Sequence, residues 1–118
     1  MRVVCGIFAM LLLAFAVVQW NDPDPVFWAA VYGAGALWCG IAAFSPGTLG
    51  WTPARVTLLA TAACAVLGVA VFWPDAERWW AIDVWWPERS GETSREAMGM
   101  MVVAAGTVVA ALVGRRRA

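Results

Sequence analysis

The sequence predicts an all-α fold, a four-helix bundle embedded in a membrane, with a Trp-rich interfacial loop between its last two helices. Of the 118 residues, 63% are hydrophobic and only 14% are charged, and the mean hydropathy is +0.73, which lies outside the range of soluble domains. The apolar residues gather in four runs, each long enough to span a bilayer. We therefore expect a single four-span transmembrane domain over residues 1–118, with spans at about 3–20, 26–44, 56–72 and 97–113.

The first span runs from Val3 to Trp20 and is apolar without a break up to Val18. About 18 residues form about 27 Å of helix, enough to cross the core of a bilayer. A small-x-small triplet at residues 14–16 also matches a signal-peptide cleavage site, but the apolar run continues beyond it. We expect the segment to be retained as a span.

A short polar turn, QWNDPDP at residues 19–25, separates the first two spans. Its two prolines remove backbone donors and push Asp22 and Asp24 toward extended conformations, so the first helix must end there. Asp24 then stands at the N-cap position of the next helix, with Pro25 at the first helical position. The segment is therefore expected to be a tight helix-to-helix turn.

Proline or glycine also marks the ends of the later spans. The second span is followed by Ser45-Pro46-Gly47 and the third by Trp73-Pro74-Asp75, while the fourth ends at Gly114 before three arginines. The spans are at the short end for a membrane crossing, so we expect little tilt.

The last two spans contain small residues at four-residue spacing, Ala60-Cys64-Gly68 and Gly106-Ala110-Gly114. Such ladders let helix backbones approach closely in lipid, where no hydrophobic effect drives helices together. We expect most of them to pack inside the bundle, and the alternative is a docking face for another membrane subunit. The cysteines lack a CxxC pair and are expected to be small buried side chains, at positions Cys5, Cys39 and Cys64.

The arginines predict the orientation of the chain. With the amino terminus in the cytoplasm, five arginines face the cytoplasm and three face outward together with all eight acidic residues. The positive-inside rule then places both termini in the cytoplasm, and we expect an integral protein of a bacterial inner (plasma) membrane. The cytoplasmic arginines would be Arg2, Arg55, Arg115, Arg116 and Arg117, and the outer ones Arg78, Arg89 and Arg95.

Tryptophan marks the expected outer boundary of the membrane. Amphipathic indole rings prefer the level of the lipid headgroups. Within the long third loop, Trp79 and Trp86 recur at helical spacing, so that Asp75 to Trp86 is expected to form a short helix on the membrane surface. The boundary set is Trp20, Trp28, Trp73, Trp79, Trp80, Trp85 and Trp86.

Two polar motifs flank the membrane spans. The first is the QWNDPDP turn followed by Trp28 and Tyr32, and the second is ETSREAMG at residues 92–99. Together they resemble the transmembrane protein 220 family, whose members are small four-span proteins with a Q-x-N-D-P-D turn after the first helix and an E-x-x-R-E-x-x-G segment entering the last. The resemblance covers nearly the whole chain in span count and loop lengths. It implies an architecture and supplies no reaction.

The expected topology brings both motifs to the outer face of the bundle. Glu92 and Glu96 are four residues apart on one helix face, and Arg95 is close enough to pair with Glu92. One interpretation is a set of hard oxygen ligands for Ca²⁺ or Mg²⁺, or a carboxylate pair for proton transfer, with Asp22, Asp24, Glu92 and Glu96 as the candidates. The whole polar cluster is Gln19, Asn21, Asp22, Asp24, Trp28, Tyr32, Glu92, Arg95 and Glu96.

The other interpretation of these residues is structural. Asp24 would cap the second helix, and Thr93 with Glu96 would form a T-x-x-E capping box for the fourth. Arg95 would then bridge to Asp22 or Asp24 and tie the two turns together. Because each of these side chains has a structural task, this interpretation is favoured over a cation site.

Two uncharged polar side chains are expected near or inside the bilayer, Gln19 and Tyr32. A polar group in lipid needs a hydrogen-bond partner. We expect them to bond each other or Asn21, or to line a small outward-facing pocket. Met98 and Met101 share a nearby face and could offer thioethers to Cu(I), but packing is the expected role without Cys or His beside them.

The composition argues against an enzyme. Histidine, the usual general base at neutral pH, is absent, and no nucleophile–base pair is visible. No span carries a charge at its middle, which argues against an ion pathway through one chain.

We expect a non-catalytic interaction or accessory subunit of a larger membrane complex, binding a partner protein or lipid through its outer polar face and Trp-rich loop. No nucleic acid and no cofactor are expected. The alternative is an outward-facing carboxylate site that binds a hard cation, Ca²⁺ or Mg²⁺, or relays protons.

Overall fold

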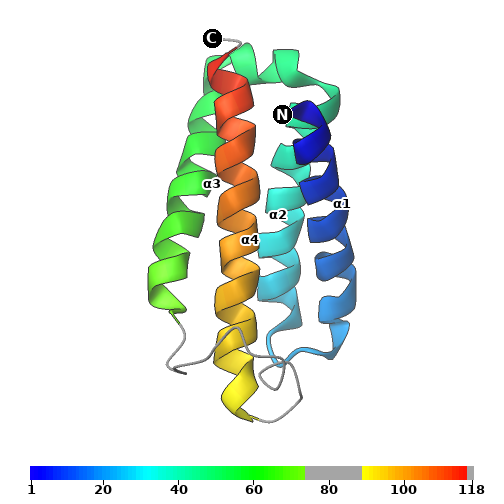
Figure 1. Ribbon diagram of the computed structural model, residues 1–118, viewed down its shortest axis with the longest axis vertical. Helices are drawn as coiled ribbons and strands as arrows, with labels where there is room; N and C mark the ends of the chain where they lie inside the picture. Colours follow the sequence, from blue (N-terminus) through cyan, green and yellow to red (C-terminus); the bar gives the residue numbers. More distant parts are fainter. Residues whose placement is uncertain (74–88, 117–118) are drawn as a thin grey trace.

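The computed structural model describes residues 1–73 and 89–116, and the side chains of 1–73 and 95–116. These residues form long helices joined by short 3-10 turns and include no strand (Figure 1). Four helices are long and apolar enough to cross a membrane, which confirms the all-α, four-span architecture. The elements are α1 (Arg2–Val18), η1 (Gln19–Asn21), α2 (Pro25–Phe44), η2 (Pro46–Gly50), α3 (Thr52–Val71) and α4 (Arg89–Arg115).

The Trp-rich loop between α3 and α4 lies mostly outside the described residues. This applies to the surface helix expected from Asp75 to Trp86 and to four of the tryptophans assigned to the membrane boundary, Trp79, Trp80, Trp85 and Trp86. Of the boundary tryptophans that the structure describes, Trp20 and Trp73 are exposed, as expected, whereas Trp28 is buried.

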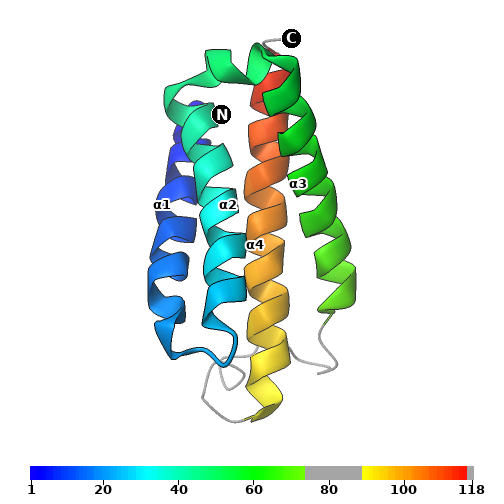
Figure 2. The ribbon, with the colours of Figure 1, turned by 180° about the vertical axis from the view of Figure 1, so that it is seen from behind.

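The bundle is elongated, with extents of 45 × 24 × 23 Å, and both termini lie at one end (Figure 1). We call this the terminal end; it also carries η2. The opposite end carries η1 and the first turns of α4, and we call it the polar end. Both views place α4 between α2 and α3, with α1 beyond α2 (Figure 2). Helix α4 packs against the other three helices, whereas α2 and α3 scarcely touch.

The central position of α4 follows from its small side chains. A Cβ added at Gly106 would lie 3.0 Å from Sγ of Cys39 and 3.2 Å from Phe8, and one added at Gly114 would lie 3.2 Å from Leu49. The expected ladder of Gly106, Ala110 and Gly114 is therefore confirmed as internal packing, because larger residues would force the helices apart.

The ladder expected in α3 behaves differently. Gly68 packs against the Met100 side chain, but Ala60 and Cys64 are exposed on the outer surface of the bundle. Four of the six ladder residues pack inside the bundle, as expected for most of them. Ala60 and Cys64 do not, because α3 contacts chiefly α4 and turns the rest of its surface outward. Of the three free cysteines, Cys5 and Cys39 are buried as expected and Cys64 is not.

Two helices begin earlier than their apolar runs. Helix α3 begins at Thr52, with Pro53 in its first turn, and α4 begins at Arg89. Hydrophobicity marks the part of a helix that lies in lipid, whereas the helix itself continues into polar sequence. Thr93 consequently lies inside α4, and the capping box expected from Thr93 and Glu96 is wrong.

The outer surface of the bundle is apolar, as a lipid-facing surface must be. Large exposed hydrophobic side chains occur on α1, α2 and α3, among them Ile7, Leu13, Leu37, Leu67 and Val71. At the terminal end, Arg2 donates from Nε to the Ala43 carbonyl at 2.9 Å and ties the start of α1 to the end of α2.

Candidate functional site

An aromatic cluster fills the bundle near the polar end. Trp28 is 2% exposed and packs against Phe72 of the α3 C-terminus, with ring centroids 5.2 Å apart. Tyr32, one turn further along α2, meets Phe15 of α1 edge-on at 5.5 Å. Trp28 is therefore buried at the polar end and is not exposed on the surface of the bundle, because its ring joins a core formed by all four helices.

Tyr32 also joins the two polar motifs. A Cβ at Gly99 would overlap the Tyr32 hydroxyl oxygen and lie 2.9 Å from Cζ. Only glycine leaves room for the phenol at this point, so the first motif contacts the second through these two residues. The sequence motif includes Gly99 but does not reveal this role. Its spacing of three residues from Glu96 and four from Arg95 places the three on one helix face, which is the signal that could have identified it.

The η1 turn is held by local hydrogen bonds. Gln19 donates from Nε2 to the Phe15 carbonyl at 3.0 Å. The expected bond from Gln19 to Tyr32 or Asn21 is not present among the described residues. The Asp22 carboxylate accepts the Asp24 N–H at 3.0 Å. Asp24 occupies the N-cap position of α2 as expected, but its side chain makes no capping bond, so that part of the prediction is wrong.

A small cavity of about 100 Å³ opens where these elements meet. The structure therefore brings together residues from η1, the following turn, α2 and α4, as expected from the two motifs. Asn21 and Asp24 are exposed and do not line this cavity, and the side chain of Glu92 lies outside the described residues. The cavity is lined by Gln19, Asp22, Trp28, Tyr32, Arg95 and Glu96.

The Tyr32 hydroxyl is the unusual atom of this cavity. Tyr32 is 6% exposed, and its hydroxyl makes no hydrogen bond to any residue that the structure describes. A buried hydroxyl without a partner costs about 1–3 kcal/mol. A molecule in the cavity that accepts or donates a hydrogen bond would remove this cost.

The cavity adjoins a longer groove of about 430 Å³ between α1 and α4. Three residues line both spaces: Gln19, Tyr32 and Arg95. The remaining walls of the groove are apolar, and Met98 and Met101 contribute to them as packing residues. Its lining away from the cavity is Phe15, Val18, Met98, Gly99, Met101 and Val102.

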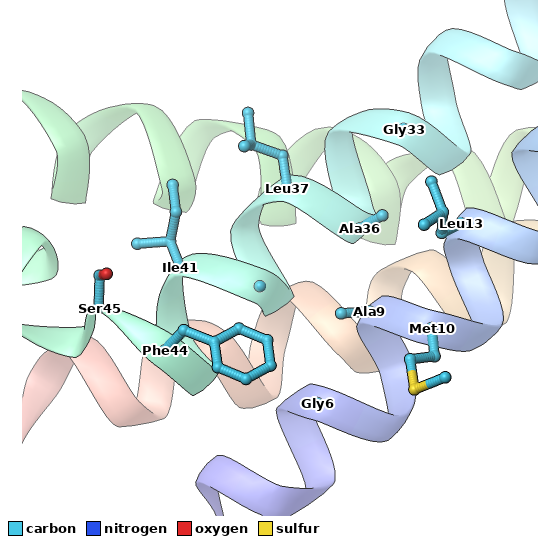
Figure 3. A pocket seen from close by; sticks show the side chains of 11 residues that line it. Gly6, Ala9, Met10, Leu13, Gly33, Ala36, Leu37, Ile41, Phe44 and Ser45 are labelled. Atoms are coloured by element: carbon cyan, nitrogen blue, oxygen red, sulfur yellow. The ribbon is translucent and has the colours of Figure 1, made fainter.

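Two other large grooves on the described surface lack charged side chains, and a smaller one of about 310 Å³ is lined by Arg55 and Arg115. The groove between α1 and α2, of about 610 Å³, is bordered by Phe44 beside Gly6 at one end and Leu13 near Gly33 at the other (Figure 3). The groove between α2 and α3, of about 580 Å³, is lined by apolar residues and Thr61. Of these grooves on the described surface, only the α1–α4 groove adjoins a cavity lined by both carboxylates and an arginine.

The candidate cation ligands are only partly brought together. Asp22 and Glu96 line the cavity, but Arg95 lines it as well. Within the described residues there is no group of three or more acidic, cysteine or histidine side chains placed to hold a metal ion.

Comparison with known proteins gives one match. A family model described as "Transmembrane family 220, helix" matches residues 11–112 and so includes both polar motifs. No curated protein and no solved structure matches the chain.

Proposed function

The chain belongs to transmembrane family 220, and from this membership and the geometry of the polar end we propose that it is a non-catalytic accessory protein of the membrane that binds a lipid. The lipid headgroup would occupy the cavity at Asp22, Arg95 and Glu96, and an acyl chain would lie in the α1–α4 groove. The observation that carries this proposal is the buried Tyr32 hydroxyl at the boundary between a polar and an apolar space.

The order of the two spaces fits an amphiphile that lies along the bundle. The cavity lies at the polar end, where a lipid headgroup would be, and the groove continues along helices that cross the membrane. Binding would satisfy the Tyr32 hydroxyl and cover Met98 and Met101 with an acyl chain. Burial of apolar area and hydrogen bonding would therefore act together.

We further propose that the polar end faces outward. Among the described residues, four arginines, Arg2, Arg55, Arg115 and Arg116, belong to or adjoin the terminal end and two, Arg89 and Arg95, lie at the polar end, so the positive-inside rule assigns the terminal end to the cytoplasm. The bound lipid would then belong to the outer leaflet. A partner protein would contact the same end through the loop between α3 and α4.

Lipid retention after purification in mild detergent tests the proposal. Met101→Trp should fill the α1–α4 groove and lower the amount of phospholipid retained per chain, as measured by native mass spectrometry. The matched control is Leu37→Trp, which adds the same ring to the α1–α2 groove of Figure 3 and should retain as much lipid as the wild type.

Both variants must show the helix content of the wild type by circular dichroism. If Met101→Trp retains as much phospholipid as Leu37→Trp and the wild type, the α1–α4 groove is not the lipid site and the proposal fails.

A further inference from the structure

We propose that the lipid bound at this site is a zwitterionic phospholipid with a primary-amine headgroup. Its ammonium would lie between Asp22 and Glu96, its phosphate against Arg95 and the Tyr32 hydroxyl, and one acyl chain in the α1–α4 groove. This inference rests on the function proposed above and names the chemical class of the ligand.

The chemistry of the lining changes in order along the site. Asp22, Trp28 and Glu96 line the cavity and not the groove, and the two carboxylates are acceptors when ionised. Gln19, Tyr32 and Arg95 line the junction with the groove, and all three carry hydrogen-bond donors. The groove beyond them is apolar. This order of acceptors, donors and apolar walls matches an ammonium, a phosphate and an acyl chain.

The donors at the junction are available for an anion. Gln19 uses one amide N–H for the Phe15 carbonyl, and its carboxamide carries a second. The Tyr32 hydroxyl has no partner among the residues that the structure describes. Arg95 has other contacts, but a guanidinium carries five N–H donors and commonly binds a phosphate through two of them.

The balance of charge selects against an anionic lipid. The cavity carries two carboxylates and one guanidinium from the described residues. A zwitterion brings an ammonium to the two carboxylates and a phosphate to the guanidinium, whereas a lipid with an uncharged headgroup and a negative phosphate brings only an anion to Asp22 and Glu96. Charge repulsion in a partly desolvated site would weaken that complex.

The hydrogen-bonding chemistry of the cavity selects the primary amine. The cavity is small, about 100 Å³. The ammonium of an aminoethyl group carries three N–H donors for the two carboxylates. A trimethylammonium group is larger and has no donor.

Competition among lipids tests this inference on the wild-type protein. Delipidated protein is exposed to an equimolar mixture of dioleoyl phosphatidylethanolamine, its mono-, di- and trimethylated derivatives and dioleoyl phosphatidylglycerol, and bound species are identified by native mass spectrometry. We expect retention to fall with each methyl group, and the primary amine to exceed the trimethylated lipid about tenfold, the effect of a lost charge-assisted hydrogen bond.

Variants of the two cavity carboxylates test whether the cavity causes the preference for the primary-amine lipid. Asp22→Asn combined with Glu96→Gln should abolish the preference for the primary amine while the groove still retains lipid. Asp24→Asn is the matched control, because Asp24 is exposed and does not line the cavity, and it should keep the wild-type preference. Soluble phosphoethanolamine should not displace the lipid, since it has no chain for the groove.

The outcomes separate this inference from the proposed function. If the α1–α4 groove retains lipid without any preference among headgroups, the headgroup assignment fails and the proposal of lipid binding stands. Loss of the preference in Asp24→Asn to the same extent as in the double variant would also overturn it. If no lipid is retained, both the headgroup assignment and the proposed lipid-binding function fail. Water would then be the partner of the Tyr32 hydroxyl.

Discussion

Tyr32 and Gly99 fix the position of α4 against α2 at the level of single atoms. The phenol occupies the space that a side chain at position 99 would need, and the same phenol packs against Phe15 and Trp28. The sequence predicts that Tyr32 lies near or inside the bilayer and needs a hydrogen-bond partner, and in the structure the side chain is buried. The sequence cannot identify Gly99 as the residue beneath the ring, because that contact depends on the register between two helices far apart in the chain.

Replacing Gly99 by a larger residue should destabilise the packing of α4 against α2. Gly99→Ala places a Cβ on the Tyr32 hydroxyl, and the forced displacement should lower the free energy of unfolding by about 1–3 kcal/mol. Unfolding in detergent, followed by circular dichroism, measures the change. Combining Gly99→Ala with Tyr32→Phe should recover part of the loss, because the overlapping oxygen is then absent.

The control for this prediction is Gly40→Ala on the lipid-facing side of α2. A Cβ at position 40 meets no heavy atom within 4 Å, so only helix propensity changes, which favours alanine by up to about 1 kcal/mol. Destabilisation of equal size at both positions would contradict the packing argument.

The two carboxylates of the cavity, Asp22 and Glu96, are expected to bind a hard divalent cation poorly. A divalent cation between Asp22 and Glu96 would lie close to the positive charge of Arg95, which lines the same cavity. We therefore expect the melting temperature in detergent to be insensitive to Ca²⁺, Mg²⁺ and chelator. Hard cations prefer six or more oxygen ligands, which these two side chains cannot supply alone.

The double variant Asp22→Asn with Glu96→Gln is the reference for that measurement. Stabilisation by Ca²⁺ or Mg²⁺ in the wild type, absent in the double variant, would favour the carboxylate cation site over the lipid site.

At the scale of elements, the sequence predicts where lipid covers a helix better than where the helix begins. The apolar runs locate all four spans, because the bilayer requires a length of apolar residues. They miss the first turns of α4, where polar residues from Arg89 onward are helical. They also cannot show which side of α3 faces lipid, because Ala60, Cys64 and Gly68 look equivalent in sequence and only Gly68 packs against Met100.

The pairing of helices likewise depends on contacts that no single run contains. Helices α2 and α3 scarcely touch, yet Trp38 of α2 donates from Nε1 to Thr61 of α3 at 3.2 Å. A polar contact of this kind is favourable in lipid, since neither group can turn to water. Small side chains therefore let α4 pack closely against its neighbours, whereas α2 and α3 are joined by a polar contact across a groove.

At the scale of the whole molecule, charge separates the two ends of the bundle. All the acidic residues that the structure describes, Asp22, Asp24, Glu92 and Glu96, lie at the polar end together with Arg89 and Arg95, while Arg2, Arg115 and Arg116 lie at the terminal end. The proposed lipid site is at the end that carries the acids. Which leaflet supplies the lipid depends on the orientation of this charge separation in the membrane.

The orientation can be measured with one cysteine at each end. Thr48 is exposed in η2 at the terminal end, and Ser90 belongs to the first turn of α4 at the polar end. In a variant whose native cysteines are replaced by alanine, a membrane-impermeant maleimide added to intact cells should label Ser90→Cys and not Thr48→Cys, because the arginines hold the terminal end in the cytoplasm. Both positions should be labelled after the membrane is permeabilised, which controls for accessibility. Labelling of Thr48→Cys alone in intact cells would reverse the orientation and move the proposed lipid site to the cytoplasmic leaflet.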